Sequence, residues 1–215
     1  MYKYFREPVN GITHLTGAIL SLIGLVIMLF KVGYSQGTAL EYICAVLFGI
    51  SMILLYSASA TYHSVIADSH IIKRLKKLDH SMIFVLITGS YAPFCLLSLK
   101  NSIGITLFIV IGILAVLGIT FKLFWVTCPR WLSSAMYIGM GWIVILAIYP
   151  LSKVLSLGGI ILLVLGGVLY TVGGVIYALK ENTIRIGLFG CHEIFHLFIM
   201  FGSLCHFLCV LLYVL

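Results

Sequence analysis

Long apolar runs, separated by short breaks of charged or turn-forming residues, dominate the chain. A membrane-spanning helix needs about 20 mainly apolar residues, and seven runs are of this order. We expect helices over Gly11–Phe30, Leu40–Tyr62, Leu78–Leu99, Ile103–Leu123, Leu132–Tyr149, Val154–Leu179 and Leu188–Leu215. These runs nearly exhaust the 215 residues. The pattern therefore predicts an all-α membrane protein in which residues 1–215 form one domain of seven transmembrane helices.

The composition supports lipid as the solvent for most of the protein surface. Apolar residues make up 62% of the chain and charged residues 9%, whereas soluble domains have about 25% charged residues. The six cysteines lie in or beside apolar runs, without the paired spacing of a disulfide framework. We therefore expect packing roles for most of these thiols.

The basic residues predict how the helices are oriented. In a seven-helix arrangement one side carries ten basic residues: Lys3, Arg6, Lys73, Arg74, Lys76, Lys77, Lys122, Arg130, Lys180 and Arg185. The other side carries three, namely Lys31, Lys100 and Lys153. Because cytoplasmic loops are enriched in Lys and Arg, we expect a cytoplasmic amino terminus and an external carboxyl terminus. The net charge of +7 is then explained by the orientation of the helices in the membrane and by contact of the basic residues with membrane lipids. This explanation excludes nucleic-acid binding.

Two local patterns concern the helix surfaces. The segment from Ile71 to Leu78 alternates between an apolar and a basic face, which suits either an interfacial helix or a simple basic loop. Gly159, Gly166 and Gly173 recur along one stripe and predict close helix packing. Lys122 lies inside the fourth predicted helix, where we expect its side chain to extend to the lipid headgroups.

The candidate chemistry lies where the predicted topology gathers histidines and a carboxylate. Asp79 and Glu193 fall in the first turns of the third and seventh helices, where an ionisable group is costly and is a functional candidate. His192 and His196 are four residues apart, so their imidazoles share one helical face. His63 ends the second helix. The topology brings these helix ends to one side, so the imidazoles and the Asp79 carboxylate share one depth.

Three imidazoles with one carboxylate can satisfy a tetrahedral zinc site, and this donor set favours zinc over magnesium or calcium. Ser59 precedes His63 by four residues and faces the same way. Its hydroxyl can contact a zinc-held water or a substrate carbonyl, or it can bond back to the carbonyl of Leu55. His192 to His196 also reads HExxH, which makes Glu193 a candidate base, although a loop lysine is an alternative partner.

Three further histidines in the predicted helices are weaker candidates for metal ligands. His14 lies about one turn into the first helix, and His80 follows Asp79, so both are expected near the site. His206 falls much further along the last helix. We expect each of the three to pack between helices or to support a ligand rather than to bind metal.

These motifs together resemble the haemolysin III family, within the progestin and adipoQ receptor superfamily. The similarity rests on Ser59-Ala60-Thr61-Tyr62-His63, on Asp79 after a basic segment, and on His192-x-x-x-His196. It extends over the stretches Glu7–His14, Leu78–Phe84, Gly89–Phe94, Tyr137–Trp142 and Gly202–Phe207. The resemblance implies seven helices and a zinc ion bound by the three histidines, with Asp79 bound through water. It also implies a location in a bacterial plasma membrane.

Relatives in this superfamily are linked to hydrolysis of lipid amides, membrane-lipid homeostasis, receptor signalling and lysis of red cells. The resemblance therefore leaves three functions open. The first is a zinc hydrolase of lipid amides or esters, in which Asp79 and Ser59 are catalytic and the lipid enters the helix bundle sideways. The second is a regulator of membrane state in which the metal clamps helices. The third is a pore, although uninterrupted apolar helices require insertion during synthesis.

Overall fold

The computed structural model describes residues 5–179, 183–187 and 189–215, and helices form nearly all of this part. The elements in chain order are α1 (Pro8–Tyr34), α2 (Ala39–Ser64), α3 (Ser69–Ala92), η1 (Pro93–Leu99), α4 (Ser102–Phe124), α5 (Arg130–Trp142), η2 (Ile143–Ala147), α6 (Ile148–Val154), α7 (Leu157–Ala178), β1 (Arg185–Ile186), β2 (Phe189–Gly190) and α8 (Cys191–Tyr213). The two short strands pair antiparallel just before α8.

Seven helical segments of the described chain are long and apolar enough to span a membrane, which confirms the predicted number. The third consists of α3 and η1, and the fifth runs from α5 through η2 to α6. The basic segment from Ile71 to Leu78 forms the first turns of α3, and is neither a loop nor a separate interfacial helix. Lys3, Lys180 and the expected helix start at Leu188 lie outside the described residues.

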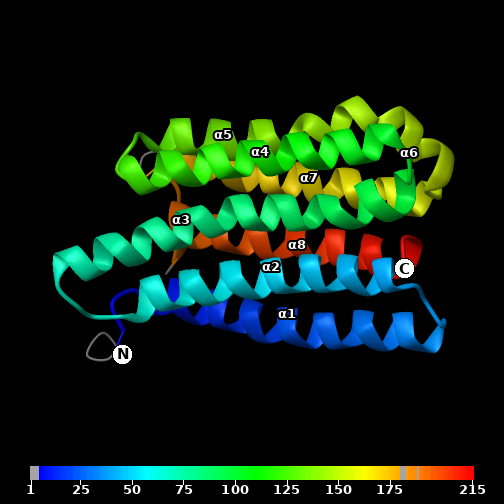
Figure 1. The fold of residues 1–215 in the computed structure, drawn as a ribbon. Helices are drawn as coiled ribbons and strands as arrows, with labels where there is room; N and C mark the ends of the chain where they lie inside the picture. The colour runs from blue at the N-terminus through cyan, green and yellow to red at the C-terminus, as the bar shows by residue number, and fades with distance from the viewer. Residues whose placement is uncertain (1–4, 180–182, 188) are drawn as a thin grey trace.

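The helices run side by side along one axis (Figure 1), and each helix packs mainly against its neighbours in the chain. In addition, α8 packs against α1, which closes the bundle between its first and last helices. The start of α1 and the end of α8 lie at opposite ends of the bundle. The end that holds the start of α1 also holds the end of α2 and the starts of α3 and α8, and we call it the amino-terminal end.

The outer faces of the helices are apolar. Phe30, Val116 and Leu146 are 75%, 64% and 78% exposed, and many other large aliphatic side chains share this exposure. Apolar surface of this extent is unfavourable in water, whereas in a bilayer the acyl chains cover it. The backbone polar groups are satisfied within the helices, as a lipid environment requires. The exposed side chains therefore fit a multi-pass membrane protein.

The predicted glycine stripe of the sixth span packs against α8. A Cβ at Gly159, Gly166 or Gly173 would come within 3.2, 2.2 or 2.9 Å of an α8 side chain, respectively. Their absent side chains allow α7 and α8 to approach closely over three helical turns or more. This close packing sets the position of α8, which carries two of the candidate histidines.

The fifth span is interrupted at η2, and Pro150 accounts for this. Proline has no N–H for the carbonyl four residues earlier, and its ring crowds that carbonyl. The Tyr91 hydroxyl compensates the break, since it accepts a hydrogen bond from the Val144 N–H at 2.8 Å and donates to the Gly141 carbonyl at 2.7 Å. The interruption lies beside the apolar cavity described below.

Lys122 differs from the sequence prediction. Its side chain is fully buried (0% exposed) and does not extend to the headgroups. The ammonium donates to Ser133 Oγ at 2.5 Å and to Cys128 Sγ at 3.1 Å. These acceptors, on the α4–α5 connection and α5, replace water for the charge, so the side chain has no need to extend outward.

Candidate metal centre

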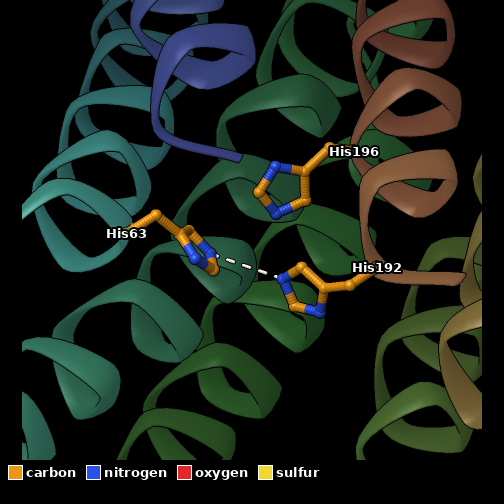
Figure 2. A group of neighbouring side chains, drawn as sticks. All are labelled: His63, His192 and His196. Carbon is orange, nitrogen blue, oxygen red and sulfur yellow. Dashed lines mark hydrogen bonds between the residues drawn. The ribbon is translucent and has the colours of Figure 1, made fainter. Parts of the chain in front are cut away.

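Three histidines meet at the amino-terminal end of the bundle, where the last turn of α2 faces the first turns of α8. His63 comes from α2, and His192 and His196 come from α8 (Figure 2). One ligand atom from each lies within 4.8 Å of the others. His63 and His196 are each 1% exposed, so the cluster is shielded from solvent. The three histidines predicted from sequence therefore come together as expected.

The donor geometry fits a metal ion. Nε2 of His63 and Nε2 of His192 lie 3.4 Å apart. Two imidazole nitrogens on a tetrahedral zinc ion, each about 2.0–2.1 Å from the metal, are separated by about 3.3 Å. Adjustments of about 1 Å in the side chains bring the widest pair, 4.8 Å at most, to this spacing. Neutral imidazoles are the donors that zinc prefers, so the residues present fit the ion.

The outer nitrogens of two rings are held by other side chains. Nδ1 of His63 lies 2.5 Å from Glu7 Oε2, and Nδ1 of His196 lies 3.5 Å from the Thr13 hydroxyl. Such contacts orient a metal-binding imidazole and leave its Nε2 for the metal, and a carboxylate also raises the basicity of the ring. Glu7 was not among the site residues predicted from the sequence. Its position directly before the first helix, at the depth of His63, was the available signal.

Glu7 is ionised at neutral pH. Burial raises the pKa of its carboxyl, but the hydrogen bond and electrostatic interaction with His63, together with the Arg6 guanidinium, lower the pKa to about 2. Arg6 Nε lies 3.3 Å from Glu7 Oε1. The Arg6 guanidinium also donates to the Tyr62 carbonyl at 2.6 Å, so this pair holds the start of α1 against the end of α2.

Asp79 and Ser59 lie beside the cluster. Asp79 is 8% exposed and Ser59 is 1% exposed, and the two side chains are within hydrogen-bonding contact. Asp79 is also close enough to His63 for electrostatic interaction. Its carboxylate is not one of the three grouped ligands. Metal binding by Asp79 through water therefore stays a prediction, as do the catalytic roles of both residues.

Glu193 is occupied at the start of α8. One carboxylate oxygen accepts from the Gly190 N–H at 2.9 Å, and the other accepts from the Asn10 side chain at 2.9 Å. The first contact caps the helix, and the second ties α8 to α1. The two histidines of the HExxH motif thus belong to the cluster, whereas its glutamate caps the amino terminus of α8.

Three of the other four histidines lie where helices pack. His14 stacks on His196 with ring centres 3.6 Å apart, and neither of its ring nitrogens has a hydrogen-bond partner among the residues that the structure describes. His80 receives a hydrogen bond on its carbonyl from Tyr137. His206 lies in the middle of α8, with Nε2 3.3 Å from the Leu163 carbonyl. The grouped metal ligands include none of them.

An apolar cavity of about 380 Å³ extends from the histidine cluster into the bundle. His196, Asp79 and Ser59 line it at one end, and His206 lines it further along. Most of the remaining lining is aliphatic or aromatic and comes from α3, α5, η2 and α7. Two lining residues, Ile145 and Val164, are also exposed on the outer face of the bundle, at 57% and 40%. The cavity therefore lies between the cluster and the lipid-facing surface.

The helices and the cluster define a multi-pass membrane protein with a buried site that can bind a metal ion. Residues 2–207 match the family model described as "Haemolysin-III related". A protein named "Hemolysin-3 homolog" from Bacillus subtilis (strain 168) is 41% identical over 99% of this chain and 96% of its own length. "Hemolysin-3" from Bacillus cereus is 40% identical over 100% of this chain and 95% of its own length. The chain belongs to the haemolysin III family.

Proposed function

We propose that this protein is a zinc-dependent hydrolase of lipid amides or esters within the bilayer. The observation that carries the proposal is that two histidines of the cluster, His192 and His196, line one apolar cavity together with Asp79 and Ser59. The cavity suits an acyl chain, and the polar groups suit a carbonyl at its end. Exposure of Ile145 and Val164 on the outer face supports entry from the side.

His63, His192 and His196 would hold the zinc ion. When bound with an open position, zinc makes a water molecule more acidic and polarises a carbonyl. Asp79 would orient the attacking water and accept its proton on a carboxylate oxygen. The Ser59 hydroxyl, which contacts Asp79, would donate a hydrogen bond to the oxygen that gains charge. The apolar lining would exclude bulk water.

We further propose that the cluster lies in the cytoplasmic leaflet of a bacterial plasma membrane. The basic residues of α3, the end of α4, the start of α5 and β1 lie at the amino-terminal end, together with Arg6. Lys31, Lys100 and Lys153 lie at the other end. This asymmetry supports a cytoplasmic amino terminus and an external carboxyl terminus. Lipids of the inner leaflet would then supply the substrate.

Hydrolysis tests the function directly. Purified, zinc-loaded protein is incubated with a panel of long-chain lipid amides and esters, and released fatty acid is measured. We expect hydrolysis by the wild type, and at least about 100-fold slower turnover in Asp79→Ala with zinc retained, because general acid–base catalysis contributes about that much. A fully metallated wild type that hydrolyses no member of the panel would overturn the proposal.

A metal-clamped regulator is the second candidate, and one observation favours it. In the structure α2 packs mainly against α1 and α3, whereas α8 packs mainly against α7 and α1. A metal ion at the cluster would therefore join two helices that otherwise have few direct contacts. On this account Asp79→Ala changes thermal stability, and the zinc-loaded wild type has no turnover for the variant to lose.

A further inference from the structure

A second cavity, of about 610 Å³, lies on the other side of the histidine cluster at the amino-terminal end. We call it the vestibule. Its lining is largely polar and includes Lys76, Arg130, Tyr62, Glu7 and Glu193. His80, Tyr177 and His192 line both the vestibule and the apolar cavity. The two cavities therefore adjoin at the proposed metal centre, and one elongated molecule can occupy both.

Positive charges gather on one wall of the vestibule. Lys76 comes from α3 and Arg130 from the first residue of α5. The buried Lys122 ammonium lies directly behind this wall, 3.1 Å from the sulfur of Cys128, which also lines the vestibule. Lys76 interacts electrostatically with both Arg130 and Lys122. Like charges repel one another, so an anion in the vestibule would be attracted to this wall.

The carboxylates of the vestibule already have partners. Glu7 interacts with His63 and Arg6. Glu193 accepts from Gly190 and Asn10. Among the described residues, no carboxylate forms an ion pair with the Lys76 ammonium. The acidic side chains of the vestibule are thus bound to the amino-terminal segment and α8. Asp79 interacts electrostatically with Lys76, but it lines the apolar cavity and not the vestibule. Among the described residues, no carboxylate that lines the vestibule is therefore paired with Lys76.

We propose that the vestibule binds the phosphate group of a lipid whose tail occupies the apolar cavity. Lys76 provides a mobile ammonium, and the planar guanidinium of Arg130 suits two phosphate oxygens at once. This inference rests on the proposed function, because it places the amide or ester between tail and headgroup beside the histidine cluster. The substrate class narrows to phosphate-bearing lipid amides and esters.

Binding of two matched lipids tests the proposal without any hydrolysis. Ceramide and ceramide 1-phosphate share the same amide and tails and differ by one phosphate. Their affinities for the full-length protein are measured in a maltoside detergent, which contains no phosphate. We expect the wild type to bind ceramide 1-phosphate at least about tenfold more tightly, as a charged hydrogen bond of about 1.5 kcal/mol provides.

Substitutions on the basic wall separate a specific site from general charge attraction. Lys76→Gln and Arg130→Gln should each remove most of the phosphate preference, whereas Lys76→Arg should retain it. Lys77→Gln is the matched control, since Lys77 is the next residue of α3 and lines neither cavity. Equal affinity for the two lipids in the wild type, or equal losses in Lys76→Gln and Lys77→Gln, would overturn the proposal.

Competition with a water-soluble phosphate compound distinguishes binding of a lipid headgroup from binding of free phosphate. Phosphoethanolamine, which has no tail, should compete with ceramide 1-phosphate only weakly. Competition by phosphoethanolamine at a comparable concentration would overturn the tail-and-headgroup arrangement. If phosphate-dependent binding is found without any turnover, the proposed hydrolase fails and only the binding of the lipid phosphate in the vestibule stands. If hydrolysis is found with no preference for phosphate, this inference alone fails.

Discussion

At the scale of single residues, the roles at the cluster follow from the second contact that each side chain makes. His63 has Glu7 on its outer nitrogen, and His196 has Thr13. Glu193 lies between the two α8 histidines in sequence, yet its oxygens are bound to Gly190 and Asn10. Sequence spacing identifies the imidazoles, whereas these outer contacts depend on how α1 lies against α2 and α8.

Removal of the Glu7 carboxylate should weaken metal binding. In Glu7→Ala the His63 ring loses the group that orients it, and loss of such a partner typically costs about 10–100-fold in metal affinity. Competition with a chelator measures this change. Glu41→Ala is the control, because Glu41 is bonded to Thr38 at the opposite end of α2. Equal affinities in wild type and Glu7→Ala would remove Glu7 from the site.

Glu193→Gln should leave most of the turnover intact. The amide side chain can still bond to Gly190 or Asn10, and the account assigns proton transfer to Asp79. We expect less than about a tenfold decrease, against about 100-fold or more for Asp79→Asn, which removes a general base. The rate of fatty acid release measures both. The reverse order would make Glu193 the base, as in soluble HExxH enzymes.

At the scale of helices, the close contact between α7 and α8 depends on glycine. A Cβ at Gly166 would lie 2.2 Å from the His206 ring, whereas Gly167 has nothing within 4 Å of the same position. The stripe also places His192 and His196, because both lie on α8. A change in α7 can therefore affect the cluster through the position of α8.

Gly166→Ala should destabilise the protein, and Gly167→Ala should not. The added methyl group at position 166 forces His206 or the helix to move, which typically costs about 1–3 kcal/mol. At position 167 alanine meets open space and has the higher helix propensity. Thermal unfolding in the same detergent compares the two variants. Equal melting temperatures would contradict the packing of α7 on α8.

The seven spans could be predicted from sequence because lipid imposes a simple requirement of length and apolar character. The depth of His63, His192 and His196 followed from the number of spans. Other features depend on tertiary contacts that periodicity does not report. Lys122 is buried because Ser133 and Cys128 lie within reach, and the basic segment joins α3 because no residue ends the helix there.

At the scale of the whole molecule, the fold brings an apolar cavity, a polar vestibule and a histidine cluster together at one end of the bundle. The cluster connects α2 with α8, so the first and last thirds of the chain both contribute to it. Both the proposed hydrolase and the metal-clamped alternative require a metal ion at this position. Metal binding by the three histidines is therefore the central claim.

Metal content of the purified protein tests this claim most directly. Elemental analysis of the wild type should find about one zinc ion per chain, as a three-histidine site binds. His63→Ala and His196→Ala should each contain little or none. His70→Ala, at an exposed position early in α3, should match the wild type. A wild type that binds no metal, or cluster variants that retain the full amount, would contradict the account.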